Sequence, residues 1–422
     1  MLFSSLDLAP ELQRGIDACD YSEMTAIQQQ AIIPARRGKD LLANAQTGTG
    51  KTAAFAIPVL QQMLNRPKST VSECPRTLIL TPTRELAEQL AEAIKDYAQF
   101  TSLKVMAIYG GVKLSAQEKK LHTGVDILVA TPGRLMEHLV QCSVQLAQVE
   151  FVVLDEADRM LDMGFIADVK TLLQKTPDNR QTLMFSATMT QSVRDLAKTL
   201  LHKHEVVSVA RQNATADTVE HVVYAVEERR KPDLFVELLD QENWFKVLVF
   251  TSTKAQADEL KTHLKQVKIK AAVCHGDKSQ GARRRAIADF KADKIQVLIA
   301  TEVAARGLDI QGLEHVVNYN LPYLAEDYVH RIGRTGRAGE KGQAISFVSR
   351  EEERSLNNIE RLIGGRVKRV KMPGYEVGSR DSLLSSLEKK ARPSRSNKPS
   401  KTQIKRGKGG AKNIRRKNES GS

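Results

Sequence analysis

The chain has 422 residues, of which 41% are hydrophobic, and a formal net charge of +14. This length exceeds what one hydrophobic core usually supports, so the sequence predicts two globular units with an appendage. No apolar run approaches the roughly 18 residues of a membrane span, and Asp7 and Glu11 stand where a signal peptide carries positive charge. The four cysteines form no Cys-x-x-Cys pair, which argues against a zinc site and a disulfide framework. We therefore expect a soluble, cytoplasmic protein without a membrane partner.

A short apolar strand at residues 40–44 leads into a glycine-rich segment and then into a helical one. The segment reads Ala45-Gln46-Thr47-Gly48-Thr49-Gly50-Lys51-Thr52. Glycines let successive backbone N–H groups face phosphate oxygens, and the helix adds the positive end of its dipole. Lys51 would reach the β and γ phosphates, and the Thr52 hydroxyl would bind magnesium. The alternative is a glycine-rich turn without a ligand, and Ala45 departs from the general pattern, which has glycine there.

A second signal is the apolar run at residues 151–154, which is followed by Asp155, Glu156 and Asp158. Four apolar residues predict a strand that is buried on both faces. Downstream of a phosphate-binding loop, the carboxylates suit a magnesium ion held by one of them and a water molecule polarised by the next. The alternative is that Asp155 only caps the following helix.

Further apolar segments lie at residues 77–80, 105–109, 127–130 and 182–185, and each ends in a turn rich in Thr, Gly, Arg or Ser. Strands that alternate with helices predict a parallel sheet whose ligand-binding loops share one edge. Hydroxyls, glycines and a guanidinium at that edge suit a sugar-phosphate backbone, although ordinary turn chemistry would also explain them.

Hydrophobic periodicity lapses at residues 210–217, which indicates a linker. The alternating unit that follows has no phosphate-binding loop, and its most charged segment is residues 330–337, with Arg331, Arg334 and Arg337. Arginine stabilises the charge that spreads over a transferred phosphoryl group, so this unit would complete the nucleotide site of the first. The alternative is a basic loop that binds phosphates nonspecifically.

The positive charge is concentrated at the C-terminus. Residues 389–422 hold thirteen Lys or Arg and one acid, a net of +12, which leaves about +2 for the rest of the chain. No aromatic residue follows Tyr375, so we expect a disordered arm. Such an arm binds polyanions through counterion release, unless it serves only solubility.

From Phe3 to about residue 350, these motifs closely resemble the DEAD-box family of ATP-dependent RNA helicases. The resemblance implies an α/β fold of two tandem RecA-like parallel-sheet domains, with ATP between them and single-stranded RNA across both. The expected divisions are a first domain at 1–209, a linker at 210–217, a second domain at 218–370 and a basic tail at 371–422.

The resemblance also implies roles for individual residues. Tyr21 would stack on adenine, Gln28 would read its amino edge, and Phe3 matches the family's isolated upstream aromatic. Other nucleotide-binding positions are Ala45, Gln46, Thr47, Gly48, Thr49, Gly50, Lys51, Thr52 and Asp309, the last at the ribose; alanine at 45 is usual in the family. In catalysis, Lys51 would bind phosphate, Thr52 and Asp155 would hold Mg²⁺, and Glu156 would activate water. Asp158 would link to Ser186, Thr188 and His330. Arg334 and Arg337 would be the arginine fingers.

For RNA, the resemblance implies backbone contacts from both domains. The matching positions are Pro82, Thr83, Arg84, Gly111, Thr131, Gly133 and Arg134 in the first domain, and Thr251, Gln280, Arg283 and Thr301 in the second. Departures from the family pattern are few: Asp20, Met24 and Ala26 replace Gly, Pro and Pro, and Glu302 replaces Asp.

We therefore expect an RNA-stimulated ATPase that unwinds short RNA duplexes or remodels RNA–protein complexes, with ribosomal precursors or RNA decay assemblies as partners. Two alternatives stay open, which are a DNA translocase of the same superfamily and an ATP-gated RNA clamp or annealing factor.

Overall fold

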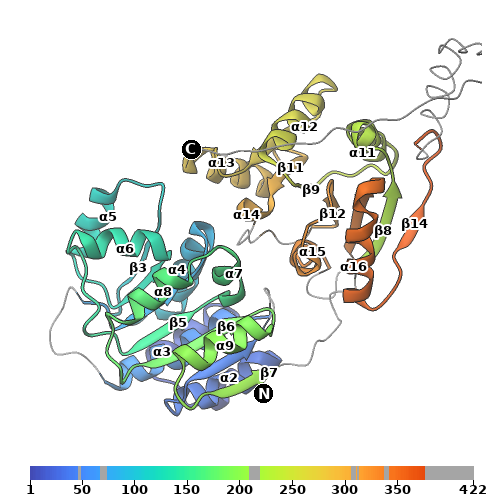
Figure 1. The fold of residues 1–422 in the computed structure, drawn as a ribbon. Coiled ribbons are helices and arrows are strands. Elements are labelled where there is room, and N and C mark those ends of the chain that lie inside the picture. The colour runs from blue at the N-terminus through green and yellow to red at the C-terminus, as the bar shows by residue number, and fades with distance from the viewer. Residues whose placement is uncertain are drawn as a thin grey trace, which may run out of the picture. The chain divides into compact units, whose positions relative to one another are not determined.

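The computed structural model describes residues 1–45, 49–66, 74–208, 219–305, 310, 313–336 and 342–375, except the side chain of Val303. The remaining predicted positions lie outside the described residues: Gln46, Thr47, Gly48, Asp309, Arg337, the linker at 210–217 and the tail from residue 376 onward. The described residues contain two seven-stranded parallel sheets (Figure 1), and the domain around each sheet is described by itself.

The sheet of the first domain has the order β3-β4-β2-β5-β6-β1-β7. Its strands are β1 (Leu41–Asn44), β2 (Thr77–Leu80), β3 (Val105–Ile108), β4 (Ile127–Ala130), β5 (Phe151–Leu154), β6 (Gln181–Ser186) and β7 (Glu205–Ser208). The helical elements are η1 (Phe3–Leu6), α1 (Pro10–Asp17), α2 (Ala26–Arg36), α3 (Lys51–Asn65), α4 (Arg84–Ala98), α5 (Leu114–Leu121), α6 (Pro132–Val140), α7 (Ala157–Asp162), α8 (Ile166–Leu173) and α9 (Gln191–Leu200).

Helices cover both faces of this sheet, because successive residues of a strand point to opposite faces and both sets are apolar. In β5, Val153 joins the core cluster that also holds side chains of α1 to α4, whereas Val152 and Leu154 join the cluster formed with α7, α8 and α9. The strands are parallel, so the loops after β1, β2, β4, β5 and β6 all emerge at the same edge.

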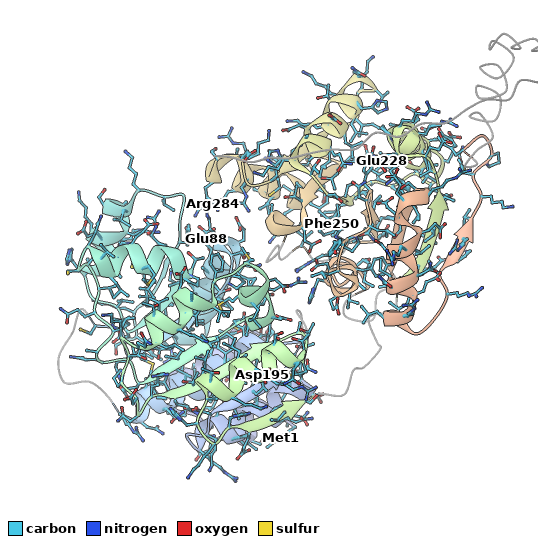
Figure 2. The ribbon with its side chains drawn as sticks, viewed as in Figure 1. Met1, Glu88, Asp195, Glu228, Phe250 and Arg284 are labelled. Carbon is cyan, nitrogen blue, oxygen red and sulfur yellow. The ribbon has the colours of Figure 1, made fainter. Side chains whose placement is uncertain are left out.

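The sheet of the second domain has the order β10-β11-β9-β12-β13-β8-β14. Its strands are β8 (Val219–Ala225), β9 (Val247–Thr251), β10 (Ala271–Cys274), β11 (Val297–Thr301), β12 (His315–Asn318), β13 (Gly342–Val348) and β14 (Lys368–Val370). The helical elements are η2 (Glu228–Arg230), α11 (Lys231–Gln241), α12 (Lys254–Gln266), α13 (Gln280–Lys291), α14 (Glu302–Ala305), α15 (Ala325–Ile332), η3 (Arg350–Glu352) and α16 (Glu353–Ile363). Phe250, labelled in Figure 2, lies near the end of β9 in the middle of this sheet.

The C-terminal boundary of the second domain was expected near residue 370, and the described chain continues to Tyr375. The Tyr375 side chain is buried against the core of this domain, and the Arg230 guanidinium lies 4.1 Å from its ring centroid.

Both sheets are the predicted α/β, RecA-like type. Among the described residues, no helix is both long enough and apolar enough to cross a bilayer.

Candidate nucleotide and RNA sites

The ends of β1 and β5 bring the glycine-rich segment and the acidic cluster together in the first domain. Lys51 begins α3, and its Nζ lies 3.0 Å from Asp155 Oδ1 and 3.7 Å from Glu156 Oε1. Gly50 precedes it with φ 85°, a left-handed conformation that glycine adopts without steric cost. The helix therefore starts with a buried lysine between two buried carboxylates.

Burial and charge act in opposite directions on this cluster. Burial raises the pKa of Asp155, and the Lys51 ammonium opposes that rise. Burial alone would lower the pKa of Lys51, but Asp155 and Glu156 raise it. Among the described atoms, Asp155 Oδ2 is buried and has no hydrogen-bond partner. A buried carboxylate oxygen left in this way can accept a hydrated cation, so the donor set fits magnesium.

The possibility that Asp155 only caps a helix is not what the structure shows. The N-cap of α7 is Glu156, and Asp155 Oδ1 instead accepts a hydrogen bond of 3.1 Å from the Glu156 backbone N–H. Glu156 has φ 54°, a conformation that costs energy in a residue with a Cβ and is often retained at functional sites. No group of three or more His, Cys, Asp or Glu side chains in the described chain could hold a metal by itself.

Asp158 connects the acidic turn to the end of β6. Its Oδ2 accepts a hydrogen bond of 2.9 Å from the Thr188 backbone N–H, and Ser186 Oγ donates to the Thr188 carbonyl at 2.8 Å. Thr188 therefore takes part in the predicted link between Asp158 and Ser186 through its backbone N–H and carbonyl groups. His330, the predicted fourth member, lies on the last turn of α15 in the second domain.

Gln28, the predicted reader of adenine, contacts the glycine-rich segment. Its Oε1 accepts from the Thr25 backbone N–H at 2.8 Å, which caps α2, and its Nε2 donates to the Gly50 carbonyl at 3.0 Å. An added Cβ at Gly50 would lie 2.4 Å from Gln28 Nε2. Gln28 is thus positioned by both the start of α2 and the start of α3.

The two predicted aromatic residues differ in exposure. Tyr21 is 38% exposed, whereas Phe3 is only 1% exposed. The Phe3 ring stacks on Tyr21 with centroids 5.8 Å apart, and the Tyr21 and Tyr97 hydroxyls are 3.4 Å apart. Phe3 therefore packs against Tyr21 from the buried side, and part of the Tyr21 side chain stays exposed, where a base could stack.

In the first domain, the predicted RNA-contacting residues lie at the same sheet edge. Thr83 caps α4 by accepting from the Leu86 N–H, and Arg84 starts that helix. Thr131 and Gly133 lie at the start of α6, and Pro82 is buried in the turn before α4. A Cβ added to Gly111, which has φ 83°, would lie 1.9 Å from Arg84 Nη1, so the guanidinium packs directly on this glycine.

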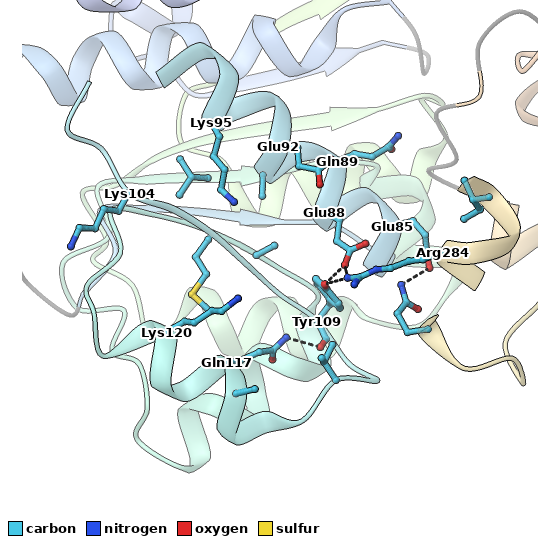
Figure 3. A pocket seen from close by; sticks show the side chains of 18 of the residues that line it. Glu85, Glu88, Gln89, Glu92, Lys95, Lys104, Tyr109, Gln117, Lys120 and Arg284 are labelled. Carbon is cyan, nitrogen blue, oxygen red and sulfur yellow. Dashed lines mark hydrogen bonds and ion pairs between the residues drawn. The ribbon is translucent and has the colours of Figure 1, made fainter. Parts of the chain in front are cut away.

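Arg134 is placed differently from a freely exposed RNA contact. It is buried, and its Nη1 donates to the Val112 carbonyl at 3.0 Å and to Gln117 Oε1 at 3.3 Å. Gln117 in turn donates to the Tyr109 carbonyl at 3.1 Å (Figure 3). Arg134 and Gln117 thus support the turn that contains Gly111. Sequence reasoning missed Gln117, since a single glutamine in a polar helix carries no signal.

Gly111→Ala is expected to weaken RNA binding about tenfold or more, because Arg84 must leave its place and one charged hydrogen bond contributes roughly 1.5–3 kcal/mol. Fluorescence anisotropy with a labelled single-stranded RNA measures the effect. Gly164→Ala is the matched control, because Gly164 has a similar φ of 76° but nothing lies within 4 Å of its added Cβ. Equal RNA affinities for these two variants would contradict the role of the Arg84–Gly111 contact.

The second domain presents Thr251 and Thr301 side by side, since they pair in register at the ends of β9 and β11. Thr251 is buried and its hydroxyl donates to the Thr253 carbonyl at 3.2 Å, whereas Gln280 and Arg283 lie in the first turn of α13. Arg334 is buried just after α15, and its backbone N–H donates to the Arg331 carbonyl. Arg337 and Asp309 lie outside the described residues.

Comparison with known proteins finds both domains. A model of the DEAD/DEAH box helicase family matches residues 25–196, and a model of the helicase conserved C-terminal domain matches residues 230–339. The chain is 42% identical over 370 residues to the ATP-dependent RNA helicase RhlB of Pseudomonas syringae pv. tomato, covering 86% of this chain and 93% of that protein. It is 39% identical over 387 residues to the ATP-dependent RNA helicase CshA of Listeria monocytogenes, covering 92% and 74%.

Solved structures give the same result for the fold. Dbp5 of S. cerevisiae bound to RNA and ADP BeF3 is similar with a TM-score of 0.78 and 32% identity, covering 92% of this chain and 99% of that one. Mss116p bound to ssRNA and AMP-PNP is similar with a TM-score of 0.78 and 27% identity, covering 92% and 82%.

Proposed function

Because the chain belongs to the DEAD-box family of ATP-dependent RNA helicases, we propose that it couples ATP hydrolysis to local unwinding of short RNA duplexes or to remodelling of RNA–protein complexes. ATP binds the first domain at Lys51, and RNA binds the strand-end loops of both domains through its sugar-phosphate backbone. Backbone contacts carry little sequence information, so the core acts on many RNAs.

The observation that carries this proposal is the position of Glu156 beside Lys51 and Asp155. Lys51 would bind the β and γ phosphates, and Glu156 would accept the proton of the attacking water molecule. Thr52 and Asp155 would hold Mg²⁺, which neutralises phosphate charge when it is bound. Arg334 and Arg337 of the second domain would stabilise the charge that develops on the γ-phosphate, so hydrolysis would require ATP and RNA to bring the domains together.

The decisive experiment is steady-state ATP hydrolysis by the full chain with single-stranded RNA, with DNA of the same sequence and without nucleic acid. We expect RNA to stimulate hydrolysis and DNA to fail to do so. Equal stimulation by DNA would favour a translocase of the same superfamily. No stimulation, combined with ATP-dependent RNA retention, would favour a clamp.

Truncation after residue 388 removes a net charge of +12. We expect it to raise the RNA concentration needed for half-maximal ATPase stimulation and to flatten the dependence of that value on salt, because fewer counterions are released on binding. The maximal rate should persist, since the truncation leaves both domains intact. Titrating RNA at several KCl concentrations measures both effects, and an unchanged salt slope would contradict an RNA-binding tail.

The cellular setting is part of the proposal. We propose action in the cytoplasm on ribosomal precursors or RNA decay assemblies, which suits a core without sequence preference and a polybasic tail. Crosslinking and sequencing of the RNA bound in cells tests this assignment.

A further inference from the structure

Arg331 is buried at the end of α15, three residues before Arg334. It is 2% exposed, and its guanidinium lies 5.0 Å from the centroid of the Phe250 ring near the end of β9. Its Nη1 donates to Asn318 Oδ1 at 3.2 Å, at the end of β12, and to the carbonyl of Asn320, two residues further on, at 2.7 Å.

The charged partner of Arg331 comes from a third strand. Glu302 follows Thr301 at the end of β11, and its Oε2 accepts a hydrogen bond of 2.5 Å from Arg331 Nε. The Glu302 side chain is 19% exposed, so this ion pair is shielded from water. In the sheet, β11, β9 and β12 are neighbours, so one guanidinium connects the ends of three adjacent strands to α15.

We propose that Glu302 and Arg331 form a positioning pair that fixes α15, and with it the finger Arg334, relative to the strand ends of the second domain. The inference rests on the proposed function of Arg334. Separating the two groups of a buried charge pair leaves each of them buried without compensation, so the pair disfavours arrangements in which α15 moves away from Glu302. Arginine suits this role, since its planar fork reaches several acceptors at once.

Glu302→Gln tests the inference, because it keeps the length of the side chain and removes its charge. We expect kcat for RNA-stimulated ATP hydrolysis to fall about ten- to hundredfold, since a misplacement of ~1 Å can cost about 10²-fold. The KM for ATP should change less than about twofold, because ATP binds mainly to the first domain. The kcat of Glu302→Asp, which keeps the charge, should lie between the kcat of Glu302→Gln and that of the parent protein.

The matched control is Glu352→Gln, which breaks another buried pair of the same domain. Glu352 Oε2 accepts from Lys231 Nζ at 2.7 Å, with the lysine side chain fully buried. We expect this variant, in which Lys231 Nζ keeps Glu228 Oε2 at 2.6 Å, to lower the urea midpoint of unfolding and to keep the parent kcat. If kcat followed the urea midpoint in both variants, the Glu302–Arg331 pair would be only structural.

A double-mutant cycle with Arg334→Ala separates this inference from the proposed function. In single-turnover assays with labelled ATP, Glu302→Gln should add no further loss once Arg334 is Ala, because the pair acts through that side chain. If Glu302→Gln lowered the single-turnover rate by the same factor with and without Arg334, the inference would be overturned, and the role of Arg334 as an arginine finger would stand. Undiminished hydrolysis by Arg334→Ala itself would instead refute the proposed function of the finger.

Discussion

Glu156→Gln is expected to reduce RNA-stimulated ATP hydrolysis by about 10²- to 10⁴-fold, the usual contribution of a positioned general base. The amide keeps the size of the carboxylate but cannot take up the proton of the attacking water molecule. Lys51 would keep its closer partner, Asp155 Oδ1 at 3.0 Å, so the phosphate-binding end of α3 should stay in place. ATP and RNA binding should persist, which equilibrium binding with each ligand measures.

The control for this change is Glu11→Gln, which removes the same charge from an exposed position on α1. It should hydrolyse ATP at the parent rate. Vigorous hydrolysis by Glu156→Gln would refute the base assignment. Loss of ATP binding together with hydrolysis would show that Glu156 supports the binding site and not the chemical step.

The elements that the sequence predicted well are those in which local pattern and tertiary environment agree. The run Phe151–Leu154 is apolar at every position, which favoured a strand covered on both faces, and it forms β5 in the centre of its sheet. The edge strands β7 and β14 were not predicted, because their exposed and charged residues carry no such pattern. Edge strands are commonly polar, since one side of the backbone has no neighbouring strand.

Within the candidate site, motifs identified residue types but not the partners that hold them. A glycine-rich segment and an acidic turn predict a phosphate and metal site wherever they occur, and the structure places Lys51 between Asp155 and Glu156. The burial of Phe3 and Arg134 could not be read from the sequence, because it depends on packing between segments far apart in the chain. The Glu302–Arg331 pair was missed for the same reason.

Arg334→Ala is expected to lower kcat by about 10³- to 10⁵-fold, the range found for arginine fingers in phosphoryl transfer. The charge that spreads onto the γ-phosphate during hydrolysis would lose a stabilising guanidinium, whereas the ground state of bound ATP gains less from it. The KM for ATP should therefore change far less than kcat, and this separation distinguishes a finger from a binding residue. Steady-state ATPase assays at saturating RNA measure both constants.

Arg334→Lys tests whether charge alone suffices. Lysine keeps the positive charge but presents a single ammonium in place of a planar fork, so it cannot hold two phosphate oxygens in fixed geometry. We expect this variant to recover only a small part of the lost kcat. Arg194→Lys is the control, since Arg194 lies on the exposed side of α9 in the first domain and should tolerate the change. Full activity in Arg334→Lys would mean that the second domain contributes only positive electrostatic potential and not a directed contact to the phosphate. Catalysis would then not require α15 to hold a fixed position.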